Sequence, residues 1–306
     1  MLIDAHSHIF PQVRGLVADG PTRGLGYGRI AVGGNEEQLM PPYNEKTIYT
    51  PEMLLANMDW AGVDKAMLLQ GTFYGDWNPY VGEALEKYPE RLIGAAFLDP
   101  WHPQAQSYFD ELIQQDRFRA VKLECSEKTG LCGLHPDAHL DDPELDWLWR
   151  ELAARQKVLV LDLGAIGSRS YQSNAVRSIA QDYPKLPIVI AHLAQPNPRA
   201  EAKLPMWRLW LAQIRLGRLP NVFFDTAALP AYMTDEDFPY PSAARYLKTA
   251  VELIGPAKIM WGSDQPGLLG VLNYPQLVRL GRLHTQFMTP REQAMVLGEN
   301  AARVYS

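Results

Sequence analysis

The sequence has few cysteines and lacks any long apolar run or any run of Lys and Arg. Its 306 residues include two cysteines, which indicates no disulfide framework and fits a reducing cytoplasm. No apolar run approaches the ~20 residues of a membrane-spanning helix, and the first residues lack the features of a signal peptide. The net charge of −6 argues against a nucleic-acid partner. We therefore expect a cytoplasmic protein with a small-molecule substrate and no membrane or nucleic-acid partner. Assembly into a homo-oligomer is possible.

Short apolar runs alternate with helical patterns along the whole chain. The predicted strands are the stretch that starts at Leu2, then 65–70, 91–98, 120–124, 158–163, 187–192, 221–225 and 258–264. The predicted helices are 51–62, 79–88, 104–115, 143–156, 174–183, 206–216 and 242–254, with further helical segments from Tyr274 and from Thr289. Strands without polar alternation are buried on both faces, as in parallel sheets covered by helices. Eight such units predict one (β/α)8 barrel domain over residues 1–306.

A doubly wound open sheet is the alternative fold. It would favour a Gly-rich phosphate-binding turn after the first strand, where this chain has His6-Ser7-His8.

Two segments stand outside the regular alternation of strands and helices. Residues 11–50 are rich in Gly and Pro without periodicity, which predicts a long loop that caps or lines a pocket, or else a floppy insertion. Residues 287–306 are expected to form a C-terminal helix.

Ionisable side chains stand at the carboxyl ends of six of the eight predicted strands. They are His6 and His8, Lys122 and Glu124, Asp162, His192, Asp225 and Asp264. In a (β/α)8 barrel these ends meet at one rim, which is where the chemistry sits. Charged side chains are rarely buried unless they are paired or bound to a metal. Strand alternation also predicts that Asp4, His6 and His8 share a face, with Asp4 held by hydrogen bonds rather than acting as a ligand.

These residue types suit one divalent metal ion, best Zn²⁺, with Mn²⁺ or Fe²⁺ as alternatives. His6 and His8 would supply nitrogen ligands, and Asp264 would supply an oxygen ligand and act as the catalytic base. Glu124 or His192 would complete the ligand set. Otherwise His192 would donate a proton or stabilise a developing oxyanion. The metal would lower the pKa of its water from 15.7 to roughly 7.

Four motifs resemble the amidohydrolase superfamily, and more narrowly its amidohydrolase-2 branch. They are Asp4-Ala5-His6-Ser7-His8, Ala191-His192-Leu193, Trp261-Gly262-Ser263-Asp264-Gln265-Pro266 and the closing Gly298-Glu299-Asn300-Ala301-Ala302-Arg303-Val304. The branch includes aminocarboxymuconate-semialdehyde decarboxylase-like enzymes and lactone hydrolases. The resemblance implies a distorted (β/α)8 barrel with a mononuclear metal centre. It implies that the first-strand His pair and the eighth-strand Asp are ligands, and that the sixth-strand His is a ligand or catalytic.

The fifth strand departs from this pattern. Much of the branch has a metal-binding His where this chain has Asp162. Asp162 is then either a substituted ligand or a residue behind the ligands, or else the metal is bound weakly or is absent. We favour Glu124 as the replacement ligand. Lys122 either pairs with Glu124 or anchors a substrate carboxylate, so an anionic substrate is one option. Trp101 and Trp261 follow strands and are predicted to form apolar walls of the substrate pocket.

Three functions compete at this point. The preferred one is hydrolysis of a small lactone or amide by metal-activated water. The second is non-oxidative decarboxylation of an unsaturated or aromatic acid on the same scaffold. The third, from another class, is a catalytically inactive barrel that serves as a binding subunit, which the missing fifth-strand His keeps open.

Overall fold

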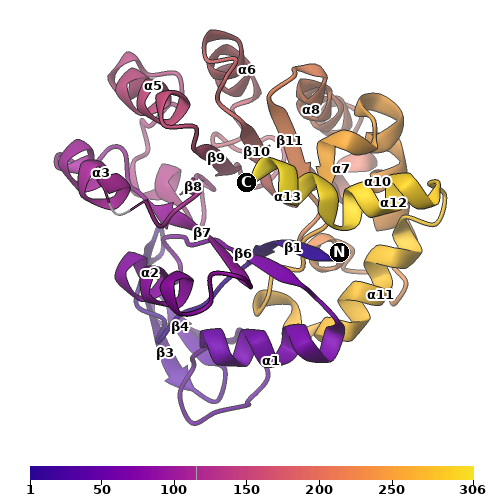
Figure 1. Ribbon diagram of the computed structural model, residues 1–306, viewed down its shortest axis with the longest axis horizontal. Helices are drawn as coiled ribbons and strands as arrows, with labels where there is room; N and C mark the ends of the chain where they lie inside the picture. The colour runs from indigo at the N-terminus through magenta and orange to yellow at the C-terminus, as the bar shows by residue number, and fades with distance from the viewer. Residues whose placement is uncertain (115) are drawn as a thin grey trace.

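The computed structural model describes residues 1–114 and 116–306, and a sheet of eight parallel strands forms its centre. Figure 1 shows the strands surrounded by helices. The strands, in sheet order, are β1 (Ile3–Ser7), β6 (Lys65–Leu68), β7 (Leu92–Phe97), β8 (Ala120–Glu124), β9 (Val158–Asp162), β10 (Ile188–Ile190), β11 (Val222–Asp225) and β12 (Ile259–Met260). A parallel bridge between Ser7 and Gln265 joins the two ends of the sheet. The predicted (β/α)8 barrel is confirmed.

Helices follow the strands and cover the outside of the barrel. The longer ones are α1 (Pro51–Ala61), α2 (Asn78–Lys87), α3 (Ala105–Gln114), α5 (Asp146–Ala154), α6 (Ser173–Asp182), α8 (Leu204–Ile214), α10 (Pro241–Ile254) and α11 (Tyr274–His284). Shorter ones are α4 (Leu131–Leu134), α7 (Pro198–Glu201), α9 (Leu229–Tyr232), α12 (Pro290–Ala294) and α13 (Asn300–Val304). The sequence predicted that the third helix ends at Gln115, and Gln115 itself lies outside the described residues.

Two apolar clusters correspond to the two faces of the barrel strands. In β9, Leu159 and Leu161 belong to the large cluster shared with the surrounding helices, whereas Val158 and Val160 belong to a smaller one. The smaller cluster takes alternate residues from the barrel strands and includes Tyr305, next to α13. It therefore fills the barrel interior. Burial on both faces explains why the strands read as continuous apolar runs.

A β-bulge in β1 sets the direction of the first histidine. The register with β6 slips between Asp4 and Ser7, so β1 has one extra residue there. Ala5 packs in the barrel interior, and Asp4 points outward, where Ser263 and Tyr274 donate hydrogen bonds to it. His6 lies on the site side of the bulge. The prediction that Asp4 shares a face with His6 and His8 is therefore wrong, because a bulge reverses strand alternation.

The segment 11–50 is not a structureless loop. It contains a four-stranded antiparallel sheet, made of β2 (Leu16–Val17), β3 (Gly20–Gly26), β4 (Arg29–Val32) and β5 (Asn35–Gln38). Labels β3 and β4 mark it beside α1 and α2 in Figure 1. Its strands are short, and β5 is exposed along its whole length. A sheet with so little buried surface leaves no apolar periodicity in the sequence.

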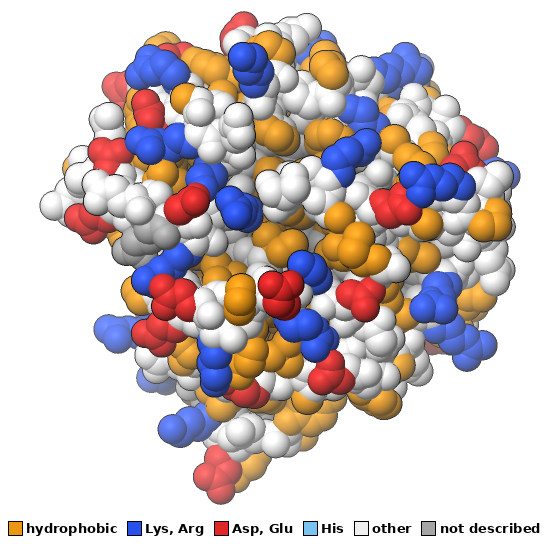
Figure 2. Space-filling model, in the orientation of Figure 1, with side chains coloured by type: hydrophobic (Ala, Val, Ile, Leu, Met, Phe, Trp, Pro, Cys, Tyr) orange, Lys and Arg blue, Asp and Glu red, His pale blue; other side chains and the backbone are white. Residues whose placement is uncertain are grey.

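The outer surface carries both signs of charge. Figure 2 shows basic and acidic side chains interspersed over the face that it presents. Among the residues that the structure describes, each helix is too short or too polar to cross a bilayer.

Candidate metal centre and active site

Seven ionisable side chains from five barrel strands or their carboxyl ends line one cavity of about 180 Å³. They are His6, His8, Lys122, Glu124, Asp162, His192 and Asp264, joined by Gly71, Phe73, Tyr74 and Thr129. The structure thus brings together the predicted ligands, the predicted catalytic pair, and two of the four predicted substrate contacts. Asp225, which the sequence also placed at this rim, lies beneath the cavity and is fully buried.

His6 presents an unpartnered nitrogen to the site. Its Nδ1 lies 3.0 Å from Oδ2 of Asp225, a carboxylate that can only accept, so the ring donates there. Its buried Nε2 has no hydrogen-bond partner among the described residues and lies 3.6 Å from Asp264 Oδ1. Burial, opposed by Asp225, lowers the pKa of His6 to about 4. His6 is therefore neutral, with an unpartnered lone pair on Nε2.

His8 repeats this arrangement from the other side of Asp264. Its Nδ1 donates to the carbonyl of Leu69 at 2.8 Å, which places the lone pair on Nε2. That atom lies 3.1 Å from Asp264 Oδ1. Burial lowers the pKa of His8, which favours the neutral ring. A lone pair then faces a carboxylate oxygen, a contact that needs a cation or a proton between the two atoms.

The convergence of these atoms fits a metal ion. Among the described residues, His6, His8 and Asp264 each offer a ligand atom within 4.8 Å of the other two. Two imidazole nitrogens and one carboxylate oxygen are ligands that Zn²⁺ takes in catalytic sites. His6, His192 and Asp225 form a second such group, but Asp225 already accepts from His6. A carboxylate behind a histidine ligand fixes the ring's tautomer and orientation.

His192 is held by acceptors on both sides. Its Nε2 lies 3.0 Å from Asp162 Oδ2 and its Nδ1 lies 3.2 Å from the carbonyl of Ala227, so both nitrogens donate. Burial disfavours the charged ring, but Asp162 outweighs it and raises the pKa of His192 to about 10. The same pairing lowers the pKa of Asp162 against the effect of burial. In this arrangement both nitrogens of His192 are engaged and its ring favours the cation; that it is a ligand or a proton donor remains a prediction.

The backbone at His192 is strained. Residues 192–195 all have positive φ, between 50° and 60°, and none of them is glycine. Such residues cost roughly 1–2 kcal/mol each in this conformation. Three contacts hold the turn: Asp225 accepts the backbone N–H of His192, the Trp210 indole donates to the carbonyl of Leu193, and the Gln195 amide donates to Asp162. The surrounding structure thus fixes the direction of the imidazole.

Lys122 and Glu124 form a buried ion pair on β8. Lys122 Nζ donates to Glu124 Oε2 at 3.1 Å, and Ser126 Oγ donates to Oε1 at 2.7 Å. Burial disfavours the charged lysine, but Glu124 and Asp162 raise its pKa. Both oxygens of Glu124 are therefore engaged, and neither three-residue ligand group among the described residues includes it. That Glu124 is a ligand remains a prediction.

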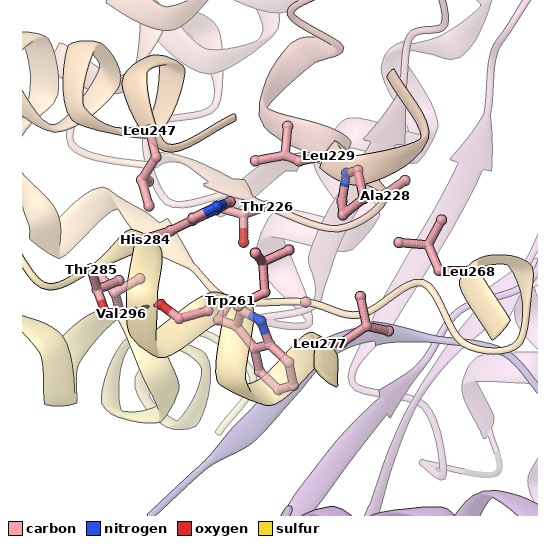
Figure 3. Close-up of a pocket in the computed structure, with 14 residues that line it drawn as sticks. Thr226, Ala228, Leu229, Leu247, Trp261, Leu268, Leu277, His284, Thr285 and Val296 are labelled. Carbon is pink, nitrogen blue, oxygen red and sulfur yellow. Dashed lines mark hydrogen bonds between the residues drawn. The ribbon is translucent and has the colours of Figure 1, made fainter. Parts of the chain in front are cut away.

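The structure does not bring Trp101 and Trp261 into the cavity. Trp261 follows Met260, which faces the barrel interior, so its own side chain points outward among the helices. Figure 3 shows it beside His284 and Leu277 in a separate cavity of about 30 Å³. Trp101 packs against His135, with ring centroids 5.7 Å apart. Strand alternation would have predicted the outward direction of Trp261.

The sequence missed four lining residues, two of which, Tyr74 and Thr129, carry hydroxyl groups. Tyr74 and Thr129 line the cavity from loops rather than from strands. The Thr129 hydroxyl pairs with that of Ser126, and its carbonyl accepts from Thr72. No local pattern marks a loop residue as part of a site, so their position follows only from the fold.

Comparison with known proteins identifies the fold and the family of this chain. L-fucono-1,5-lactonase of Burkholderia ambifaria is 24% identical over 278 residues, which covers 87% of this chain and 89% of the lactonase. A zinc-bound amidohydrolase from Burkholderia multivorans superposes with a TM-score of 0.72 at 18% identity, covering 100% of this chain and 99% of that one. A probable 2-pyrone-4,6-dicarboxylic acid hydrolase from Acinetobacter baumannii, crystallised with citric acid, has a TM-score of 0.69 at 16% identity, with coverages of 99% and 98%. The Amidohydrolase family model (Amidohydro_2) matches residues 3–306, and the chain belongs to this family.

Proposed function

We propose that this chain is a metal-dependent hydrolase that opens a small lactone, with cyclic amides as related substrates. One observation carries the proposal. Two unprotonated histidine nitrogens and an oxygen of Asp264 converge at the floor of a cavity that also holds the buried cation His192. A cyclic ester fits because the curated relative at 24% identity opens a lactone.

His6, His8 and Asp264 would hold the ion, most plainly Zn²⁺, with Mn²⁺ or Fe²⁺ as alternatives. When bound, it would lower the pKa of a water molecule and polarise the carbonyl of the substrate. Burial alone would raise the pKa of Asp264, but the contact with His8 and the nearby imidazoles of His6 and His192 lower it to about 2. Asp264 is therefore ionised at neutral pH and able to act as a base.

The reaction needs one proton carrier and one site for negative charge. Asp264 takes a proton from the attacking water as the oxygen of that water bonds to the carbonyl carbon. The carbon–oxygen ring bond then breaks, Asp264 returns the proton to the departing ring oxygen, and a hydroxy acid is released. His192 stabilises the negative charge that develops on the carbonyl oxygen, since preorganised positive groups act most strongly in a desolvated site.

The charge of the cavity favours a neutral substrate over an anionic one. Lys122 is already paired with Glu124, and His192 is paired with Asp162. Asp264, the proposed metal ligand, carries the remaining charge among the lining side chains. Three arginines of the 11–50 segment also lie away from the cavity: Arg14, Arg23 and Arg29 are exposed and are not among the lining residues. A dicarboxylate would thus meet no unpaired positive side chain in the lining, and the proposed ion would have to balance both of its charges as well as that of Asp264.

The test is a substrate panel with the purified, metal-loaded protein. We expect acid release from δ-valerolactone and related neutral lactones, followed with a pH indicator, and loss of this activity in His6→Ala and Asp264→Asn. Release of CO2 from aromatic acids without lactone opening would instead identify a decarboxylase. Absence of both activities, with less than about a tenth of an equivalent of bound metal, would leave the inactive binding subunit as the better account.

A further inference from the structure

Tyr74 is held rigidly at one side of the site. Its ring stacks on Phe10 with centroids 4.6 Å apart and lies 4.9 Å from the ring of His8. A methyl group placed on Gly267 would lie 3.2 Å from Asp264 Oδ2 and 4.0 Å from the Tyr74 hydroxyl. The hydroxyl therefore lies on the same side as the oxygen of Asp264 that does not face the histidines.

Tyr232 approaches the site from another direction. It ends the short helix α9, which begins after Ala228, a residue with positive φ. Its ring meets that of His192 edge-on, with centroids 6.1 Å apart. The charges of Asp162, Asp264 and Glu124 all act on its hydroxyl and, after burial, raise its pKa well above the usual value. Tyr232 thus sits beside the cation of the site, as Tyr74 sits beside the base.

The two tyrosines flank the part of the rim that carries the proposed ligands. Tyr74 follows β6, and Tyr232 follows β11. In the barrel, β6 and β11 are the outer neighbours of the pair formed by β1 and β12, which lead into His6, His8 and Asp264. The two side chains therefore approach the site from either side of this pair of strands: Tyr74 lines the cavity, and Tyr232 packs against His192.

Neither hydroxyl is used by the protein itself. Among the described residues, neither has a hydrogen-bond partner, whereas the buried hydroxyls of Tyr171, Tyr246 and Tyr274 each donate to an oxygen. A phenol has an ordinary pKa of about 10, so both hydroxyls carry their protons at neutral pH. Both side chains are half-buried, and each hydroxyl is a donor without a protein partner on a ring that lies beside His8 or His192.

We propose that Tyr74 and Tyr232 bind the substrate, each donating a hydrogen bond to one of its oxygen atoms from opposite sides of the His6–His8–Asp264 cluster. This inference rests on the proposed function, because it requires a substrate with a carbonyl group. Tyr232 lies nearer the carbonyl oxygen that His192 stabilises, and Tyr74 lies nearer the oxygen that receives the proton from Asp264. Together they orient the ring of the substrate for attack.

Tyr74→Phe and Tyr232→Phe test the proposal, because they remove only the hydroxyl. Each should lower kcat/KM for δ-valerolactone by about tenfold, the effect of losing one hydrogen bond. Metal content and melting temperature should stay at wild-type values. Tyr43→Phe, on an exposed ring, is the matched control and should leave kinetics unchanged. Wild-type kinetics in both site variants would overturn the proposal.

Binding of an unreactive carbonyl compound separates this inference from the proposed function. Cyclohexanone contains a carbonyl but no bond that can be hydrolysed, and ligand-observed NMR titration gives its dissociation constant. We expect each site variant to weaken its binding several-fold relative to wild type and Tyr43→Phe. Weakened binding without any lactone turnover in wild type would support the tyrosines and reject the lactonase. Equal binding by all four proteins, or no binding by wild type, would reject the role of the tyrosines.

Discussion

At the scale of single residues, the account depends on where the protons of three histidines lie. His6 and His8 each donate through Nδ1, to Asp225 and to the carbonyl of Leu69, and each leaves Nε2 free for the site. His192 donates through both nitrogens and so keeps its positive charge. The same residue type therefore serves two chemical roles, and the hydrogen-bond partners decide between them.

Asp225→Asn should weaken metal binding. Asp225 Oδ1 accepts the backbone N–H groups of His192 and Ala227, so the asparagine oxygen would take that place and its amide would face His6 Nδ1. His6 would then carry its proton on Nε2 and lose its lone pair toward the site. We expect an affinity for Zn²⁺ about 10–100-fold lower, as for other partners of metal ligands, measured by competition with a chelator. Asp59→Asn, on the surface, is the control, and equal affinities would contradict the assignment.

Asp162→Asn should move the alkaline limb of the pH–rate profile. Asp162 holds the pKa of His192 at about 10 against the opposing effect of burial. Without that carboxylate the pKa of His192 falls. As the pH is raised, His192 then loses its positive charge at a lower pH than in wild type. In wild type kcat/KM should fall only above about pH 9, and in the variant the fall should begin at lower pH. Superimposable profiles would show that the charge of His192 is not required.

At the scale of elements, the sequence predicts where the strands end, but it predicts the direction of only some of their side chains. Apolar runs that end in His192, Asp225 or Asp264 reveal the rim, because ionisable groups are expelled from a packed core unless they are paired. The bulge that turns His6 toward the site and Asp4 away from it depends on pairing with β6, a contact that the local sequence does not encode. The small sheet in residues 16–38 escaped prediction because its strands are short and largely exposed.

Asp4 joins the two strands that supply the proposed ligands. It accepts from the backbone N–H groups of His6 and Ser263 and from the hydroxyls of Ser263 and Tyr274, all within the core. Asp4→Ala would leave these donors buried without an acceptor. We expect a loss of about 3 kcal/mol in the free energy of unfolding, measured by urea denaturation, against an unchanged value for the exposed control Asp19→Ala. A loss below about 1 kcal/mol would show that β1 and β12 are held together in another way.

At the scale of the whole molecule, the barrel brings residues that are far apart in sequence to one ring. His8 and Asp264 are separated by 256 positions, yet their side chains lie 3.1 Å apart. The sequence therefore predicts which strands contribute, since every parallel strand ends at the same rim. It does not predict which loop side chains close the pocket, and Tyr74 and Tyr232 were found only from their places in the fold.

Removal of the metal should lower the stability of the whole barrel. A ligand that binds only the folded state at 100 times its dissociation constant adds about 2.7 kcal/mol. For a chain of this size, we expect a decrease of roughly 5 °C in melting temperature on chelation, followed by calorimetry and reversed by Zn²⁺. His6→Ala should show no such dependence on metal. An equal shift in that variant would place the stabilising ion elsewhere.

The most direct test of the central claim is anomalous diffraction from crystals of the metal-loaded protein, measured at the absorption edge of the bound metal. The account predicts one strong peak about 2.0–2.2 Å from His6 Nε2, His8 Nε2 and an oxygen of Asp264. No peak at these three atoms, in crystals of protein that opens δ-valerolactone at its full rate, would contradict it.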